Sequence, residues 1–137
     1  MTAVHNSHPT VFECHGAWLR AAAHDGATVL EIGGEIDACN ADRISEHAQR
    51  YISSGPVLVV DMSLVDFFGV TGLRILTVLN DECRRLGIDW ALIPSRAVSF
   101  LLRIADVDGA VPMVESVTAA LQRFKSRGPN ASGRRNP

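Results

Sequence analysis

Short apolar runs alternate with amphipathic stretches along most of this chain, and this alternation limits its possible folds more than any other feature. Apolar runs at 57–60, 90–93 and 111–114 each predict a short strand, and the aliphatic run at 57–60 suits a strand buried on both faces. The stretches between and after them repeat apolar residues every three or four positions, which is typical of helices packed on one side. A chain of this kind is expected to form an α/β layer structure.

The part of the chain before this alternation predicts a β-hairpin. Two apolar stretches at 17–23 and 27–34 are separated by His24, Asp25 and Gly26. Asp-Gly between such stretches favours a tight turn, because glycine accepts a positive φ angle. The hairpin adds antiparallel strands to a sheet that is otherwise parallel.

Four amphipathic segments are expected to be helices. Asn40 is placed as the N-cap of the first, Gly87 ends the second, and Ser95 and Ser116 open the third and fourth. We therefore predict a single α/β domain, with a mixed sheet of about five strands and about four helices. The expected order is ββαβαβαβα, with helices over residues 40–53, 71–86, 95–105 and 116–124.

Length and charge divide the chain into one domain with two loose ends. Its 137 residues suit one domain, expected over residues 17–124. Residues 1–16 show no periodicity and are expected to form a flexible arm. Residues 125–137 carry four of the 13 basic residues and no acidic one, which predicts a basic, disordered tail. Residues 1–124 carry the other nine basic residues and all 15 acidic ones, so this part of the chain has a net negative charge. Nucleic acid is therefore not the expected partner, because binding to its phosphates needs a basic surface.

Several classes of protein are not expected from this sequence. The longest unbroken aliphatic run has four residues, far short of the ~18 that a membrane span needs. The first residues lack the pattern of a signal peptide, and the three cysteines lie far apart, so a reducing cytoplasm is the expected location. No phosphate loop, dinucleotide fingerprint or metalloprotease motif is present. We expect no metal, no cofactor and no enzymatic activity.

The segment 59–73 carries the most information about function. It leaves the carboxyl end of a central strand and enters a helix, where ligands and partners usually meet an open α/β sheet. Thr71 lies at the start of this helix. A phosphate on its hydroxyl would face unpaired backbone N–H groups, whereas the simpler interpretation is that Thr71 caps the helix and Gly72 permits close packing.

Four pieces of sequence, in order, resemble the STAS domain of bacterial anti-sigma factor antagonists. They are Gly34-Glu35-Ile36-Asp37, Val59-Val60-Asp61-Met62-Ser63, Gly72-Leu73, and Ile93-Pro94-Ser95 followed by Val98, Leu101 and Leu102. The resemblance covers about residues 17–124. It implies a cytoplasmic protein that binds an anti-sigma factor, often a kinase-like ATP-binding protein, and thereby releases a sigma factor. The resemblance implies these partner-binding residues: Asp37, Phe68, Gly69, Val70, Thr71, Gly72 and Arg74.

The chain departs from the family pattern at the switch itself. Proteins of this family carry Asp-Ser-Ser/Thr-Gly, and the kinase phosphorylates a Ser; here the four positions are Gly69, Val70, Thr71 and Gly72. Val70 has no hydroxyl, which puts ordinary phosphorylation control in doubt. Three hypotheses follow: constitutive binding through Val70, phosphorylation of Thr71 instead, or control by thiol oxidation. For the last, Cys39 is the candidate, because it precedes a helix N-terminus.

Two further interpretations stay open. The domain could be a structural or regulatory subunit of a larger lipid-transport or stress-signalling complex. It could also bind a small ligand in the crevice at the strand ends, although no acid/base pair is evident there. The sequence does not give the oligomeric state.

Overall fold

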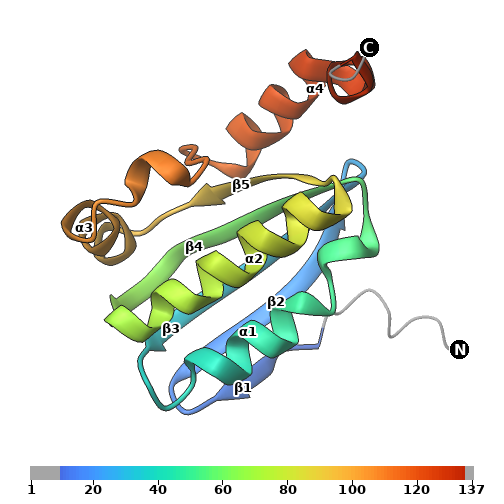
Figure 1. The fold of residues 1–137 in the computed structure, drawn as a ribbon. Helices are drawn as coiled ribbons and strands as arrows, with labels where there is room; N and C mark the ends of the chain where they lie inside the picture. Colours follow the sequence, from blue (N-terminus) through green and yellow to red (C-terminus); the bar gives the residue numbers. More distant parts are fainter. Residues whose placement is uncertain (1–9, 135–137) are drawn as a thin grey trace, which may run out of the picture.

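A five-stranded mixed sheet forms the centre of the protein. The computed structural model describes residues 10–134, and the side chains of residues 10–126. The strand order is β1-β2-β3-β4-β5; β1, β2 and β3 are antiparallel, whereas β3, β4 and β5 are parallel (Figure 1). The predicted α/β class and mixed sheet are thus confirmed. The strands are β1 (Phe12–Cys14), β2 (Ala17–His24), β3 (Ala27–Ile36), β4 (Val57–Phe68) and β5 (Asp89–Ile93).

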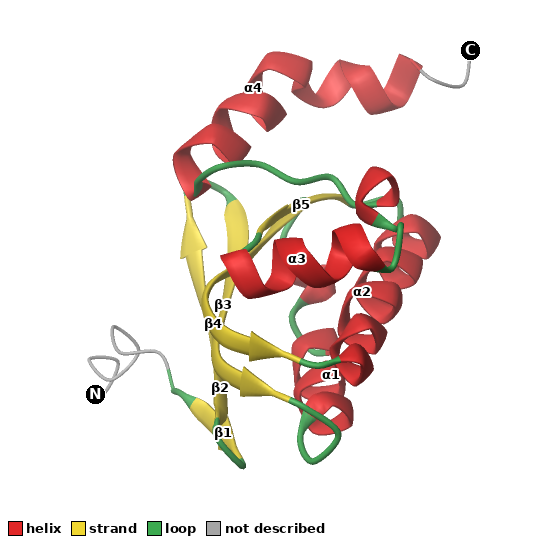
Figure 2. Cartoon of the chain, turned by 90° about the vertical axis from the view of Figure 1, so that its left-hand side faces the viewer, coloured by secondary structure: helices red, strands yellow, loops and turns green. Residues whose placement is uncertain are grey.

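Four helices flank the sheet. Figures 1 and 2 show α1 and α2 together on one face, with α4 over one end of the sheet. None of the helices within residues 10–134 is long and apolar enough to cross a membrane. The helices are α1 (Ala41–Gln49), α2 (Leu73–Leu86), α3 (Arg96–Ile104) and α4 (Val117–Arg134), with short 3₁₀ turns at Ile52–Ser54, Val70–Gly72 and Asp108–Ala110.

Two apolar cores hold these layers together. The larger lies between the sheet and helices α1, α2 and α3, and includes fully buried residues such as Leu30, Ile44 and Leu79. The smaller lies on the opposite face of the sheet, where Ala120 of α4 packs with Val59 and other residues of β4 and β5. The sheet is therefore covered along one face and only partly along the other.

Strand β1 lies within the segment that was expected to be a flexible arm. His15 and Gly16 adopt positive φ angles of 46° and 92°, which turn the chain back so that Cys14 pairs with Ala17. Phe12 packs against the main core and stacks on His47 at 4.0 Å between ring centroids. This burial explains the difference from the expectation. Residues 1–9 of the expected arm lie outside the described residues.

Strand β4 is much longer than the aliphatic run at 57–60. Most of the loop expected at 62–70 continues the strand as far as Phe68, still paired with β3. The strand expected at 111–114 contributes only an isolated bridge, between Met113 and Leu92. The sheet still has five strands, because β1, which was not predicted, pairs with β2 at the opposite edge.

The helix ends also differ from the sequence expectations. Helix α1 stops at Gln49, and a 3₁₀ turn follows before β4. Helix α4 continues to Arg134, across most of the tail that was expected to be disordered. Residues 135–137 lie outside the described part of the chain. Ser95 caps α3 as predicted, because its Oγ accepts a hydrogen bond from the Val98 N–H at 3.1 Å.

Candidate functional site

The carboxyl ends of β3 and β4 bring the two candidate loops together. Ile36 pairs with Phe68 at the ends of these strands, and the Gly69 N–H donates a hydrogen bond to the Ile36 carbonyl oxygen at 2.8 Å. A Cβ atom on Gly69 would lie 3.4 Å from that oxygen and 3.8 Å from Cα of Asp37. The residues expected from sequence at 37 and 69–72 therefore meet at one edge of the sheet.

Val70 and Thr71 form the most accessible part of this edge. The Val70 side chain is 69% exposed, the highest value among the exposed large apolar residues that the structure describes. Thr71 is also exposed, and no hydrogen bond of its hydroxyl is found among the described residues, so the interpretation of Thr71 as a helix cap is wrong. The start of α2 thus presents an apolar side chain beside an unoccupied hydroxyl.

Gly72 and Phe68 are buried beneath this surface. Phe68 is only 6% exposed, so its ring is not available to a partner as the sequence expectation required. A Cβ on Gly72 would lie 2.5 Å from Cε1 of Phe68, which shows that the helix start rests directly on the ring. Gly72 serves as a spacer rather than as a contact. Phe67, which was not selected from sequence, is the exposed ring, at 53%.

Asn40 fixes the loop that carries Asp37. Asn40 is the N-cap residue of α1, as predicted, but its fully buried side chain makes no capping hydrogen bond to the helix. Instead Oδ1 accepts a hydrogen bond from the Asp37 N–H at 3.0 Å, and Nδ2 lies within 3.2 Å of the carbonyl oxygens of Cys14, His15 and Glu35. These contacts tie the loop to the β1–β2 turn and to the end of β3.

Asp37 and Arg74 border the exposed surface. The Asp37 carboxylate accepts a hydrogen bond from the Cys39 N–H at 2.9 Å, which stabilises the turn before α1. Arg74 of α2 forms an ion pair with Asp42 of α1, with 3.2 Å between Nε and Oδ1. Both side chains are mostly exposed, so the pair contributes at most about 1 kcal/mol to stability. Its geometry nevertheless holds Arg74 at the rim.

The cysteines differ sharply in accessibility. Cys39 is exposed beside Asp37, whereas Cys14 and Cys83 are buried. Cys14 is buried because β1 places its side chain against the fold. Burial, with smaller contributions from Glu82 and Asp89, raises the pKa of the Cys83 thiol to about 11. Cys83 is therefore an unreactive core thiol, and Cys39 is the accessible one among the described residues.

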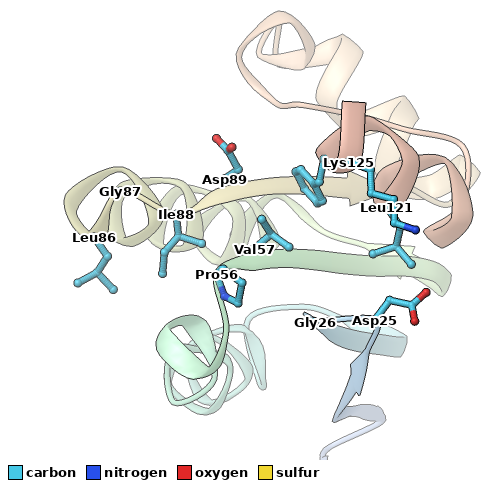
Figure 3. A pocket seen from close by; sticks show the side chains of 11 residues that line it. Asp25, Gly26, Pro56, Val57, Leu86, Gly87, Ile88, Asp89, Leu121 and Lys125 are labelled. Carbon is cyan, nitrogen blue, oxygen red and sulfur yellow. The ribbon is translucent and has the colours of Figure 1, made fainter. Parts of the chain in front are cut away.

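An open cavity lies away from this edge. It has a volume of about 740 Å³ and lies where β4 and β5 begin, between the β2–β3 turn and α4 (Figure 3). Val57, Ile88 and Leu121 line its apolar part, with Asp25 and Lys125 at its border. Ligands of open α/β sheets usually bind at the carboxyl ends of the strands, and this cavity lies at the amino ends of β4 and β5. This cavity therefore does not support the hypothesis that a small ligand binds in a crevice at the carboxyl ends of the strands.

No metal site is evident in the described part of the chain. Among those residues, no three His, Cys, Asp or Glu side chains gather closely enough to hold an ion. His5 and His8 lie outside the described residues. The edge presents the exposed apolar side chain of Val70 beside the Thr71 hydroxyl and the Arg74 guanidinium, a combination that suits protein binding.

Comparisons with known proteins agree with this description. The chain is 39% identical over 110 residues to "Osmosensory protein A" of Mycobacterium tuberculosis, covering 77% of this chain and 70% of that protein. It is 30% identical over 103 residues to "Anti-sigma-F factor antagonist RsfA" of the same species, covering 72% and 80%. For "Anti-sigma-F factor antagonist RsfB" the identity is 40% over 65 residues, and the match spans only 47% of this chain and 53% of that protein.

A solved structure and a family model were also compared with this chain. The crystal structure of an anti-sigma factor antagonist from Mycobacterium paratuberculosis has the same fold, with a TM-score of 0.70 and 23% identity over 80% of this chain and 94% of that one. The family model for the STAS domain matches residues 19–120. The chain belongs to the STAS domain family.

Proposed function

We propose that this protein is an anti-sigma factor antagonist of the cytoplasm that acts by binding and has no enzymatic activity. Its surface for the anti-sigma factor would consist of Asp37, Gly69, Val70, Thr71 and Arg74. Two relatives carry the name of anti-sigma-F factor antagonist. The observation that carries the proposal is the exposure of Val70, in the position where the family pattern has its phosphorylated serine.

Binding would be constitutive in this proposal. A phosphoserine at the switch position would place a charge at the interface, and Val70 cannot be modified in this way. Thr71 offers the alternative, since its hydroxyl is exposed and lies at the start of α2. We expect the partner to have a kinase-like ATP site, so both possibilities can be tested with the same pair of proteins.

The test uses the anti-sigma-F factor of Mycobacterium tuberculosis as the probe. Val70→Asp should weaken its binding at least 30-fold by titration calorimetry, because a carboxylate would lose its water in an apolar interface, at a cost of about 2 kcal/mol or more. Val11→Asp is the matched control, because Val11 is exposed and precedes the edge strand β1. It should leave the affinity within about twofold of the wild type.

The same mixture with ATP distinguishes the modes of control. An unchanged intact mass together with unchanged binding supports the constitutive antagonist. A gain of one phosphate on Thr71, with loss of binding, would replace it by ordinary switching at the neighbouring residue. Failure of the wild-type protein to bind contradicts the proposal and favours the alternative of a subunit in a larger complex.

A further inference from the structure

Two bulges in β4 place apolar side chains on the sheet face that α1 and α2 do not cover. The register shifts between Glu31 and Gly33 of β3, and again between Gly34 and Glu35, so that β4 has one additional residue at each place. As a result Leu64 lies opposite Gly33, and Phe67 lies opposite Glu35. Without the bulges, two residues three apart would point to opposite faces.

Both side chains are half exposed although they belong to a central strand. Leu64 is 54% exposed and Phe67 is 53% exposed. Helix α4 packs on the same face of the sheet, but at the other end, over Val59, Ala91 and Ile93. Figure 2 shows α4 at that end, away from the carboxyl end of β4.

Trp18 of β2 extends the apolar surface across the sheet. Trp18 pairs with Gly33, which in turn pairs with Leu64. A Cβ on Gly33 would lie 2.3 Å from Cζ2 of Trp18, so the indole ring lies flat over the glycine. The absence of a side chain at Gly33 thus leaves Trp18 and Leu64 as neighbours across β3. We call Trp18, Leu64 and Phe67 the open-face strip.

Carboxylates border the strip. Glu13 pairs with Trp18 and Glu35 pairs with Phe67, and both glutamates are exposed. The cation beside the strip is Arg20, which forms an ion pair with Glu31 and lies 5.9 Å from the centre of the Trp18 ring. Neither Glu13 nor Glu35 has an ion pair with another described residue. The charge at the border is therefore negative.

The strip is continuous with the surface around Val70. A Cβ on Gly69 would lie 3.4 Å from Cε2 of Phe67, so the Phe67 ring lies against the residue before Val70. Leu64 and Phe67 near the end of β4 and Val70 in the 3₁₀ turn that follows it are all at least half exposed. Half-exposed aromatic side chains in a contiguous apolar patch are typical of protein-binding surfaces.

We propose that the open-face strip is a second contact region for the anti-sigma factor, and that it receives a segment of that partner with apolar side chains flanked by Lys or Arg. This inference rests on the proposed function, because the occupant is the same partner. The apolar strip would bury the apolar side chains, and Glu13 and Glu35 would face the basic ones. The partner would contact both the start of α2 and the open face of the sheet.

The test compares two phenylalanines of similar exposure with the same anti-sigma-F factor as the probe. Phe67→Ala should weaken binding at least tenfold by titration calorimetry. Phe100→Ala is the matched control, because Phe100 is 57% exposed but belongs to α3, and it should change the affinity less than twofold. Thermal unfolding of each variant checks that the fold is intact. Leu64→Arg provides a second variant of the strip, with the same expected loss.

Charge reversal tests the border of the strip. Glu35→Lys should weaken binding and reduce the decrease in affinity between low and high salt, because one attractive charge pair becomes repulsive. If the wild type binds and Val70→Asp abolishes binding, but Phe67→Ala and Leu64→Arg match Phe100→Ala, the strip is not a contact and the proposed function stands. If the wild type does not bind at all, the proposed function itself is contradicted.

Discussion

Asn40 shows how one residue can organise a whole surface. Its buried amide joins the Asp37 loop to the β1–β2 turn and to the end of β3, so the partner-facing loop depends on it. An Asn before a helix is most often a cap, and the sequence therefore predicted one. The sequence did not reveal the actual role, because it depends on β1, a strand too short and too irregular in pattern to be expected.

Replacing Asn40 by Ala should destabilise the protein by about 2–3 kcal/mol, because the substitution leaves buried backbone groups without a hydrogen-bond partner. For a domain of this size that corresponds to a decrease in Tm of roughly 6–12 °C, measured by circular dichroism. Asn80→Ala is the graded control. The Asn80 side chain accepts one hydrogen bond, from the Trp90 indole N–H, and is half-buried, so the decrease should be about half as large. Equal decreases would contradict the organising role of Asn40.

At the scale of elements, strands β2, β3 and β5 and helices α2 and α3 lie close to where their sequence patterns predicted them, whereas β1 and the second half of β4 were not predicted. The repeat of Leu76, Leu79 and Cys83 gave α2 correctly, because a helix needs only local spacing. The length of β4 depends on its pairing with β3, which no local pattern contains. Its buried residues Met62, Val65 and Phe68 recur every third position, a spacing that arises from the two bulges.

The same limit explains the errors at the candidate site. Phe67 and Phe68 are neighbours on a strand, so their side chains point to opposite faces of the sheet, and one ring is exposed while the other is buried. Which ring is buried depends on the second bulge, so the sequence selected Phe68 and missed Phe67. Asp37, Gly69 and Val70, which the family resemblance implied as partner contacts, lie together in the structure because β3 and β4 are parallel and end at the same edge of the sheet.

The contact between β1 and α1 should make stability depend on pH. His47 of α1 stacks on Phe12 with an interplanar angle of 7°, and burial, assisted by the charge of Arg50, lowers the pKa of His47. Because the folded pKa lies below the unfolded value of about 6.5, the contribution of His47 to stability is present above pH ~6.5. It is lost as the pH falls through the folded pKa.

His47→Gln removes this titration. The difference in unfolding free energy between wild type and His47→Gln, measured with urea at several pH values, should decrease from pH 7.5 to pH 5. Thr77→Ala serves as the control, because Thr77 is exposed on α2 and its side chain does not titrate between these pH values, so its difference from wild type should stay nearly constant. A His47 difference that grows toward low pH would mean that the ring prefers its charged form in the fold.

At the scale of the whole molecule, the two faces of the sheet differ in how far helices cover them. Helices α1, α2 and α3 seal one face with the main core, whereas α4 covers only part of the other. The uncovered part adjoins the start of α2, so the two surfaces that we propose for the partner meet at the end of β4. A helix covering the full open face would leave no room for the strip to bind anything.

The partial cover by α4 leads to a prediction about truncation. Among the described side chains of α4, Phe124 is the last that packs on the sheet, so a chain of residues 1–126 keeps every such contact that the structure describes. Its Tm should stay within about 2 °C of the full chain, although much of the basic tail is gone.

A chain of residues 1–115 instead exposes Val59 and Ile93, at a cost of roughly 1.5–3 kcal/mol in folding free energy for each side chain. That loss is a large part of the 5–15 kcal/mol typical of a domain, so this chain should unfold at far lower urea concentration. If residues 1–126 lose as much stability as residues 1–115, then the part of α4 beyond Ser126 contributes to the fold, and the second core is larger than the contacts of Val117, Ala120, Leu121 and Phe124 indicate.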